Sequence, residues 1–267
     1  MKNILMLAHD DAGQEARLQC ALDLTRGLSG HLTCVDVTQP PVYVADYFGS
    51  MGGAAGLVEE QTREAANATR IKARLENEDV AWDWIDASGE ISRRVRDHAG
   101  LSDAIVVNLR LQAGFNPNMH DIASAVVMGV RGVVVAVPDN WKRFDVGGIA
   151  LVAWDGSPAV MATLQRTIPL LALASSVQLL TIDDGSDGRS AEDAATYLSR
   201  HSIHASIKRL PIGLVAADVH IRKSCEGDRA AYCVMGAYGH SRLSEKLFGG
   251  VTRRMLDKSK VPIVLGH

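Results

Sequence analysis

The chain carries one order of strands and helices that occurs twice. Short runs rich in Val, Ile and Leu alternate with amphipathic stretches, the pattern of a parallel sheet buried between helices. Strands are expected over residues 3–8, 31–38, 81–87, 104–109 and 132–138, and again over 149–154, 177–182, 205–210, 231–235 and 261–265. Helices are expected over 13–28, 59–77, 91–101 and 121–130, and again over 159–174, 191–201, 215–225 and 251–257. This repeat predicts two tandem doubly wound α/β domains, since the units of a solenoid are several times shorter.

Two pairs of segments mark equivalent places in the halves. ILMLAHDD from Ile4 and IALVAWDGS from Ile149 both read as a buried strand that ends on an aspartate ahead of a helix. VVVAVPD and VPIVLGH each close a half. The polar segment Asp139–Gly148 between the halves is short enough to leave them close together. We expect one domain over residues 1–142 and another over 143–267.

Composition allows two domains and narrows their class. At 267 residues and 47% hydrophobic content, the chain is long enough for two cores. The net charge of -3 gives no electrostatic argument for a nucleic-acid or membrane partner. The 4 cysteines form no CxxC pair, which favours a reduced, cytoplasmic setting over a disulfide framework or zinc site. No apolar stretch approaches the roughly 20 residues of a membrane span.

One long connection breaks the repeat. Between the second strand and second helix of the first half lies QPPVYVADYFGSMGGAAGLV, whereas the second half has only DDGSDGR there. Long loops in compact domains are usually lids or contact surfaces. Because Tyr43–Met51 contains apolar side chains, this loop is expected either to contact a partner or to pack back on its own domain.

Glycines gather after the fourth strand of the second half. The stretch VMGAYGHSRLSEKLFGGVT holds Gly236 and Gly239, then Gly249 and Gly250 where a helix begins. Glycine lets the backbone approach a ligand, and a helix N-terminus binds anions through its unpaired N–H groups. Ligands of open α/β sheets bind beyond the carboxyl ends of the strands, where AWDGS and TIDD also lie. With the Thr252 hydroxyl, the stretch predicts a phosphate-binding nest.

The basic residues near this stretch have two interpretations. Arg242, Lys246, Arg253 and Arg254 either attract an anion or form a solvated helix face. The stretch is not a P-loop, because no Lys-Ser/Thr pair follows its glycines. The nest is therefore predicted from its place at the strand ends rather than from the glycines alone.

On these residues the second half resembles the universal stress protein family. Its nucleotide-binding members carry Gly-x2-Gly-x9-Gly-Ser/Thr here, and Gly236, Gly239 and Gly249 keep that spacing. The resemblance covers the whole chain as a tandem pair of such domains, specific in the second half and weak in the first. It implies two five-stranded, mainly parallel sheets of order 3-2-1-4-5 flanked by helices. It also implies an adenine nucleotide, ATP or AMP, with or without Mg²⁺.

The resemblance assigns roles at three strand ends. Asp155 would bind the ribose hydroxyls, and the backbone around Ile182 and Asp183 would contact the adenine edge. The complete set of predicted nucleotide-binding residues is Ala153, Trp154, Asp155, Gly156, Ser157, Ile182, Asp183, Met235, Gly236, Tyr238, Gly239, Gly249, Gly250, Val251 and Thr252. No catalytic or metal-binding residue is predicted.

The second half departs from the family pattern at Gly250, where the family has Ser or Thr. Loss of a hydroxyl bond to a charged phosphate costs about 1.5–3 kcal/mol, or roughly 10- to 100-fold in affinity. Because the backbone N–H is kept, we expect weaker binding rather than none. The relative affinity for ATP and AMP depends on this position, and Gly250→Ser is expected to tighten ATP binding.

The first half departs further. Asp10 is assigned to the place of Asp155, and Asp11-Ala12 to the place of Gly-Ser. Asn108 and Leu111 stand where the first two glycines should be. Their side chains would fill the space of a pyrophosphate, so we predict no nucleotide there by the family's mode.

Taken as a member of this family, the chain would be a stress-response protein that binds a nucleotide and regulates, with any ATP hydrolysis slow or absent. The halves would pair through VVVAVPD and VPIVLGH, and two chains would form a homodimer. One alternative is a weak ATPase that uses Asp155 and His240 around Mg²⁺. Another is a ligand-free scaffold that acts through Tyr43–Met51. The protein partner stays unknown.

Overall fold

A computed structural model describes residues 1–38, 52–109, 122–183, 189–211, 213, 215–237 and 250–267. The strands are β1 (Asn3–Ala8), β2 (His31–Thr38), β3 (Ala81–Ser88), β4 (Ala104–Asn108), β5 (Val133–Val137), β6 (Ile149–Ala153), β7 (Ser176–Asp183), β8 (Ala205–Pro211), β9 (Tyr232–Gly236) and β10 (Ile263–Gly266). The helices are α1 (Gln14–Leu28), α2 (Gly52–Leu75), α3 (Ile91–His98), α4 (Ile122–Gly129), α5 (Pro158–Leu171), α6 (Ala191–Ser199), α7 (Ala217–Gly227) and α8 (Gly250–Lys258).

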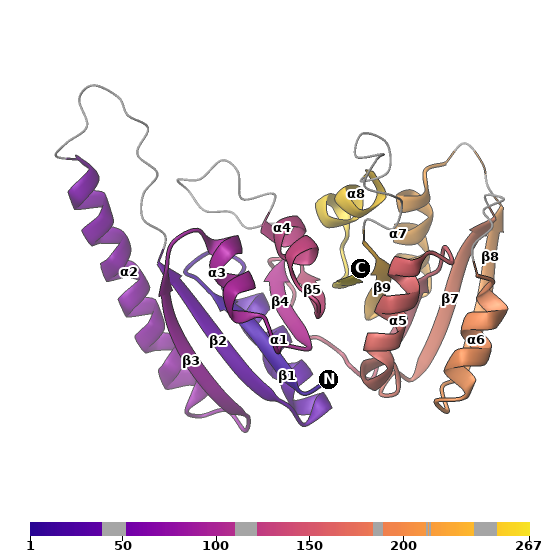
Figure 1. Ribbon diagram of the computed structural model, residues 1–267, viewed down its shortest axis with the longest axis horizontal. Helices are drawn as coiled ribbons and strands as arrows, with labels where there is room; N and C mark the ends of the chain where they lie inside the picture. Colours follow the sequence, from indigo (N-terminus) through magenta and orange to yellow (C-terminus); the bar gives the residue numbers. More distant parts are fainter. Residues whose placement is uncertain (39–51, 110–121, 184–188, 212, 214, 238–249) are drawn as a thin grey trace.

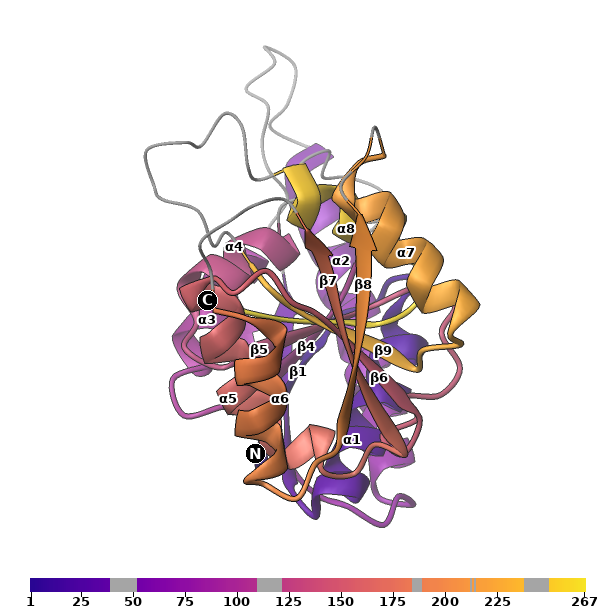
Figure 2. The same cartoon turned by 90° about the vertical axis from the view of Figure 1, so that its right-hand side faces the viewer.

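The described strands form a single sheet in the order β3-β2-β1-β4-β5-β10-β9-β6-β7-β8 (Figure 1). Each half has the order 3-2-1-4-5, so the predicted fold of two tandem doubly wound domains is confirmed. The halves meet where β10 pairs antiparallel with β5, with Val264 opposite Val135. This is the predicted pairing of VVVAVPD with VPIVLGH. Figure 2, a view along the sheet, shows that successive strands are rotated relative to one another, which is the usual twist of a β-sheet.

Alternate side chains of each central strand enter cores on opposite faces of the sheet. Met6 of β1 and Val152 of β6 belong to a core with α1, α2, α5 and α6. Leu5 and Leu151 belong to the other core, with α3, α4, α7 and α8. Burial on both faces explains the continuous apolar runs AIVVN in β4 and VVVAV in β5.

The connection between β5 and β6 packs against both halves. The Phe144 side chain is 1% exposed and stacks on Tyr232 of β9, with ring centroids 5.2 Å apart. The Phe144 backbone N–H donates to Asp23 Oδ2 of α1 at 2.8 Å. The expectation that this segment keeps the halves close therefore holds, while the division between residues 142 and 143 stays a prediction.

The main difference from the expected elements is the start of α2. The helix begins at Gly52, whereas the glycine-rich sequence predicts a loop as far as Val58. Glycine costs about 1 kcal/mol in a helix, but a helix that is already nucleated extends cheaply. Residues 39–51, which include most of the predicted contact loop, lie outside the described residues. In the described ranges every helix is too short or too polar to cross a membrane.

Candidate functional site

Three strand ends of the second half meet at one edge of the sheet. Ala153, the last residue of β6, pairs with Met235 of β9 on one side and with Leu180 of β7 on the other. These strands are parallel, so the segments that follow them leave from the same edge. The order of the chain reverses between β6 and β9, which is where such sheets bind ligands.

A tight turn holds Asp155 at this edge. The backbone N–H of Ser157 donates to Asp155 Oδ1 at 3.0 Å, and Gly156 takes the left-handed conformation with φ of 68°. Ser157 then caps α5, because its Oγ accepts the backbone N–H of Val160 at 3.3 Å. Asp155 is exposed, and the other carboxylate oxygen accepts no hydrogen bond from the described residues. That oxygen is available to a ligand hydroxyl.

Trp154 plays a structural part in this turn. Its side chain is 5% exposed within the core, and Nε1 donates to the carbonyl of Arg189 at 2.8 Å. Its backbone N–H donates to Leu180 at 2.8 Å, which extends the pairing of β6 with β7. The neighbouring Ile182 is half-buried near the end of β7, and Asp183 is the last residue of that strand. The Asp183 side chain lies outside what the structure describes.

Gly236 is required for the packing of β9 on α5. A Cβ at this position would lie 2.6 Å from the backbone N of Val160 and 3.0 Å from the carbonyl carbon of Ala159. The glycine that was predicted to let a ligand approach therefore lets a helix approach. The two functions are compatible, because α5 begins at the same turn that holds Asp155.

We expect Gly236→Ala to lower the free energy of unfolding by about 1–3 kcal/mol, because the methyl group would meet backbone atoms that cannot rotate away. Urea unfolding measures the change. Gly227→Ala is the matched control, since a Cβ at Gly227 has no atom within 4 Å. Equal stability of the two variants would contradict the close approach of β9 and α5.

The predicted phosphate-binding end is described only in part. Gly250 is the first residue of α8, followed by half-buried Val251 and by Thr252, which is 4% exposed. The predicted residues Tyr238, Gly239 and Gly249 lie outside the described residues, as do His240 and Tyr43–Met51, on which the two alternative functions depend. In the described residues, contacts join residues 153–157 to Met235 and Gly236, and the link from Gly236 to α8 runs through residues 238–249.

The first half has a matching turn, but a different aspartate occupies it. Gly13 precedes α1 and donates its N–H to Asp11 Oδ1 at 2.7 Å, as Ser157 does to Asp155. The assignment of Asp10 to the place of Asp155 is therefore wrong. The connection from β1 to α1 is longer than that from β6 to α5, so counting from the strand misplaces the carboxylate.

In both halves the fourth strand packs closely against the start of the first helix, and a glycine makes this possible. In the second half the glycine is Gly236 on the strand, whereas in the first half it is Gly13 ahead of the helix. Residues 12 and 13, rather than 11 and 12, stand in the place of Gly-Ser. A Cβ on Gly13 would lie 2.2 Å from Asn108 Nδ2. Asn108 occupies the place of Gly236, as predicted. The residue after each of them donates its backbone N–H to the last strand of its half, Leu109 to Val137 and Ala237 to Gly266. Leu111 lies outside the described residues.

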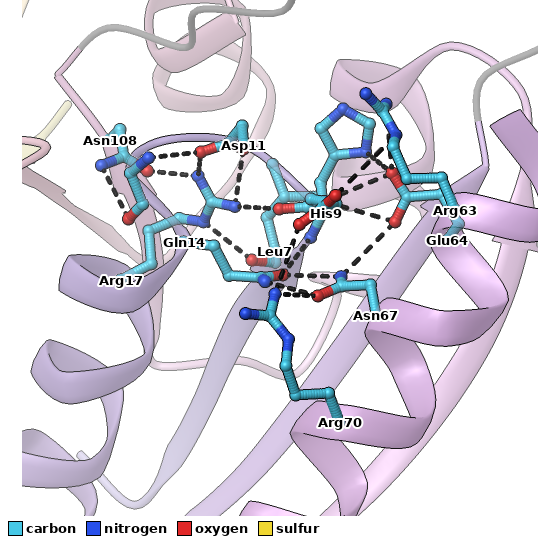
Figure 3. Close-up of polar contacts among 12 residues, drawn as sticks. Leu7, His9, Asp11, Gln14, Arg17, Arg63, Glu64, Asn67, Arg70 and Asn108 are labelled. Atoms are coloured by element: carbon cyan, nitrogen blue, oxygen red, sulfur yellow. Dashed lines mark hydrogen bonds and ion pairs between the residues drawn. The ribbon is translucent and has the colours of Figure 1, made fainter.

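A buried arginine binds the aspartate turn of the first half (Figure 3). Arg17 is 0% exposed, and its guanidinium donates to the two carboxylate oxygens of Asp11 at 2.8 and 3.0 Å. It also donates to the carbonyls of Leu7 at 2.9 Å and His9 at 2.8 Å, and to Asn108 Oδ1. Arg17 engages both oxygens of Asp11, and the Asp11 side chain is only 2% exposed, which supports the prediction that this half takes no nucleotide by the family's mode.

Comparisons with known proteins find universal stress proteins among those similar to this chain. No protein-family model matches the sequence. A universal stress protein of Synechocystis is 22% identical over 298 residues, which cover 99% of each chain. The crystal structure of a universal stress protein from Archaeoglobus fulgidus has the same fold, with a TM-score of 0.73 at 11% identity over 99% of this chain and 96% of that one. A functionally unknown protein from Pseudomonas aeruginosa gives a TM-score of 0.61 at 14% identity over 100% and 92%.

Proposed function

The chain resembles universal stress proteins of the tandem form along its whole length, and from this premise we propose that its second half binds an adenine nucleotide, ATP or AMP. The protein would act in stress response by binding and regulation, and any hydrolysis would be slow or absent. The contrast between the two aspartate turns carries the proposal. Asp155 is exposed at the strand ends, whereas its counterpart Asp11 is bound by Arg17.

The remaining residues fit a nucleotide in a consistent order. The backbone at the end of β7 would contact adenine, Asp155 would hold the ribose, and the first turn of α8 would face the phosphates with its N–H groups. Among the described residues, no group of three His, Cys, Asp or Glu side chains is placed to hold a metal. Mg²⁺ would therefore arrive with the phosphates of ATP.

The Asp155→Asn variant tests the ribose contact. Its amide oxygen still accepts the Ser157 N–H and so keeps the turn, but an NH₂ group replaces the second acceptor. We expect roughly 10-fold or greater loss of affinity for ATP and AMP, because a hydrogen bond to a charged group is worth about 1.5–3 kcal/mol. Titration calorimetry measures it, with the exposed Asp193→Asn of α6 as the control. Unchanged affinity in Asp155→Asn would remove Asp155 from the site.

A ligand retained from the cell gives a second test. Mass spectrometry of the extract from freshly purified, denatured protein is expected to detect an adenine nucleotide. Absence of a nucleotide, together with no calorimetric response to millimolar ATP, ADP or AMP, would favour the scaffold alternative.

The family resemblance also supports a cytoplasmic homodimer. The edge strands β3 and β8 and the outer helix faces are available for such an assembly, because the last strands already pair within one chain. Sedimentation equilibrium should give twice the chain mass of 28.7 kDa. A monomer at micromolar concentration would contradict this proposal.

A further inference from the structure

A buried carboxylate of α7 fixes an arginine of α8. Asp218 lies in the first turn of α7 and is 1% exposed. Its Oδ1 accepts Arg254 Nε at 2.6 Å, and its Oδ2 accepts Arg222 Nη2 at 3.3 Å. A carboxylate this deeply buried is stable only when it is paired, so Arg254 is held in place through Nε. Within the part of the chain that the structure describes, the two terminal nitrogens of Arg254 make no hydrogen bond.

The fixed guanidinium occupies the side-chain space of residue 250. A Cβ on Gly250 would lie 2.7 Å from Arg254 Nη1 and 3.4 Å from Cζ. Helical side chains point toward the N-terminus, so a residue covers the position four before it. Gly250 is also the residue at which the sequence departs from the hydroxyl of the family's motif. The Arg254 guanidinium therefore lies where the hydroxyl side chain of the family's motif would be.

The Arg254 guanidinium and the N-terminal end of α8 together favour the binding of an anion. A guanidinium beside the positive end of a helix dipole is unfavourable in isolation. Thr252 lies in the same turn and is 4% exposed, and its hydroxyl makes no hydrogen bond to the residues that the structure describes. The Arg254 side chain is 42% exposed, so a ligand can reach it. An accessible fork of N–H donors, with a threonine hydroxyl in the same helical turn, suits phosphate oxygens.

We propose that Arg254, positioned by Asp218, replaces the missing hydroxyl of residue 250 and selects nucleotides with a long phosphate chain, ATP over AMP. This inference rests on the proposed function. Adenine would lie at β7 and ribose at β6, and α8 follows β9 on the far side of β6. Neighbouring strands are about 4.8 Å apart, so the first turn of α8 is reached by the outer phosphates rather than by the one next to the ribose.

Titration calorimetry of the full chain with ATP, AMP and adenosine tests the inference. Arg254→Met should weaken ATP binding roughly 10- to 100-fold and leave AMP and adenosine within about 3-fold. Arg254→Lys keeps the charge and a bond to Asp218 but loses the fork, so it should weaken ATP binding several-fold and remain folded. Arg253→Met is the matched control, since it removes the same charge from the exposed neighbouring residue and should change ATP affinity less than about 3-fold.

Two double variants separate positioning from general structural damage. Asp218→Asn should weaken ATP binding in the unmodified chain but have no further effect in the Arg254→Met background. Gly250→Ser would displace the guanidinium in the unmodified chain, whereas in the Arg254→Met background it restores a hydroxyl. Its gain in ATP affinity should therefore be larger in that background. Additive effects in both pairs would overturn the inference.

The outcomes distinguish the two proposals. If the unmodified chain binds ATP and the Arg254 variants bind it equally well, the role of Arg254 is refuted and the proposed function stands. If Arg254→Met weakens ATP and AMP equally, the selection of ATP is refuted. If the unmodified chain binds no adenine nucleotide, both proposals fail together.

Discussion

Replacement of Arg17 by methionine is expected to lower the free energy of unfolding by about 3–5 kcal/mol, the cost of breaking a buried ion pair by removing one partner. Methionine is chosen because Met161 holds the corresponding position of α5, four residues after the helix cap. The side chains of Arg17 and Asp11 are 0% and 2% exposed, so water cannot replace the lost donors. The carbonyls of Leu7 and His9 would lose donors as well.

Urea unfolding measures this loss, and two variants make the result specific. Arg70→Met removes an arginine whose side chain is 66% exposed and whose bond to Asp10 is 3.3 Å long. It should cost no more than about 1 kcal/mol. In the Arg17→Met background, Asp11→Ala should restore part of the stability, because it removes the uncompensated carboxylate. Equal losses for Arg17→Met and Arg70→Met would mean that water reaches the Arg17 guanidinium.

The Arg17 network also explains how two similar halves differ. In the first half, an arginine of the chain itself uses the carboxylate that in the second half faces outward. The same turn is thus a structural element in one half and a candidate binding element in the other. We expect titrations to show one nucleotide per chain.

The strands could be predicted from the sequence because they depend on local patterns, whereas their order in the sheet followed from the family resemblance. Continuous apolar runs mark strands buried on both faces, and the repeat of the whole order marks the tandem fold. The pairing of β5 with β10 also followed from the family resemblance, and the structure adds that the two strands run antiparallel. The start of α2 was missed because glycine lowers the helix propensity of a window even where the following turns carry the helix.

The site was harder to predict because its contacts join distant residues. Arg17 bonds to Asn108 across 91 positions, and Arg254 to Asp218 across 36. In the sequence, Arg17 gives one signal, a charged residue between the apolar positions 16 and 18 of an amphipathic helix. The pair Asp10-Asp11 gave none, since either carboxylate fits the pattern and only the turn geometry distinguishes them.

A second expected result concerns pH. Asp36 of β2 is 5% exposed, and its Oδ1 has no hydrogen-bond partner among the described residues. Burial, followed by the negative charges of Glu64 and Asp86, raises the pKa of Asp36 from 3.8 to about 7, against the opposing charges of His9 and Lys72. The carboxyl group thus binds its proton more tightly in the folded state than in the unfolded state.

The sign of the effect follows from this difference. The contribution of Asp36 to stability is complete below the unfolded pKa of 3.8 and is lost as the pH rises to about 7. Asp36→Asn removes the ionisation. The free energy of unfolding of the variant, minus that of the unmodified chain, should therefore increase with pH by at most about 1.4 kcal/mol per unit, and level off above neutral pH.

Urea unfolding at half-unit steps from about pH 4.5 to 8 would measure this difference. This range covers most of the interval between the unfolded pKa of 3.8 and the folded pKa of about 7. Asp86→Asn is the matched control, because Asp86 pairs with Asp36 across the strands but its side chain is 76% exposed. It should leave the pH dependence in place, with a slightly lower midpoint because one repelling charge is gone. A pH-independent difference for Asp36→Asn would show that Asp36 is ionised throughout, with a counter-charge close enough to offset its burial.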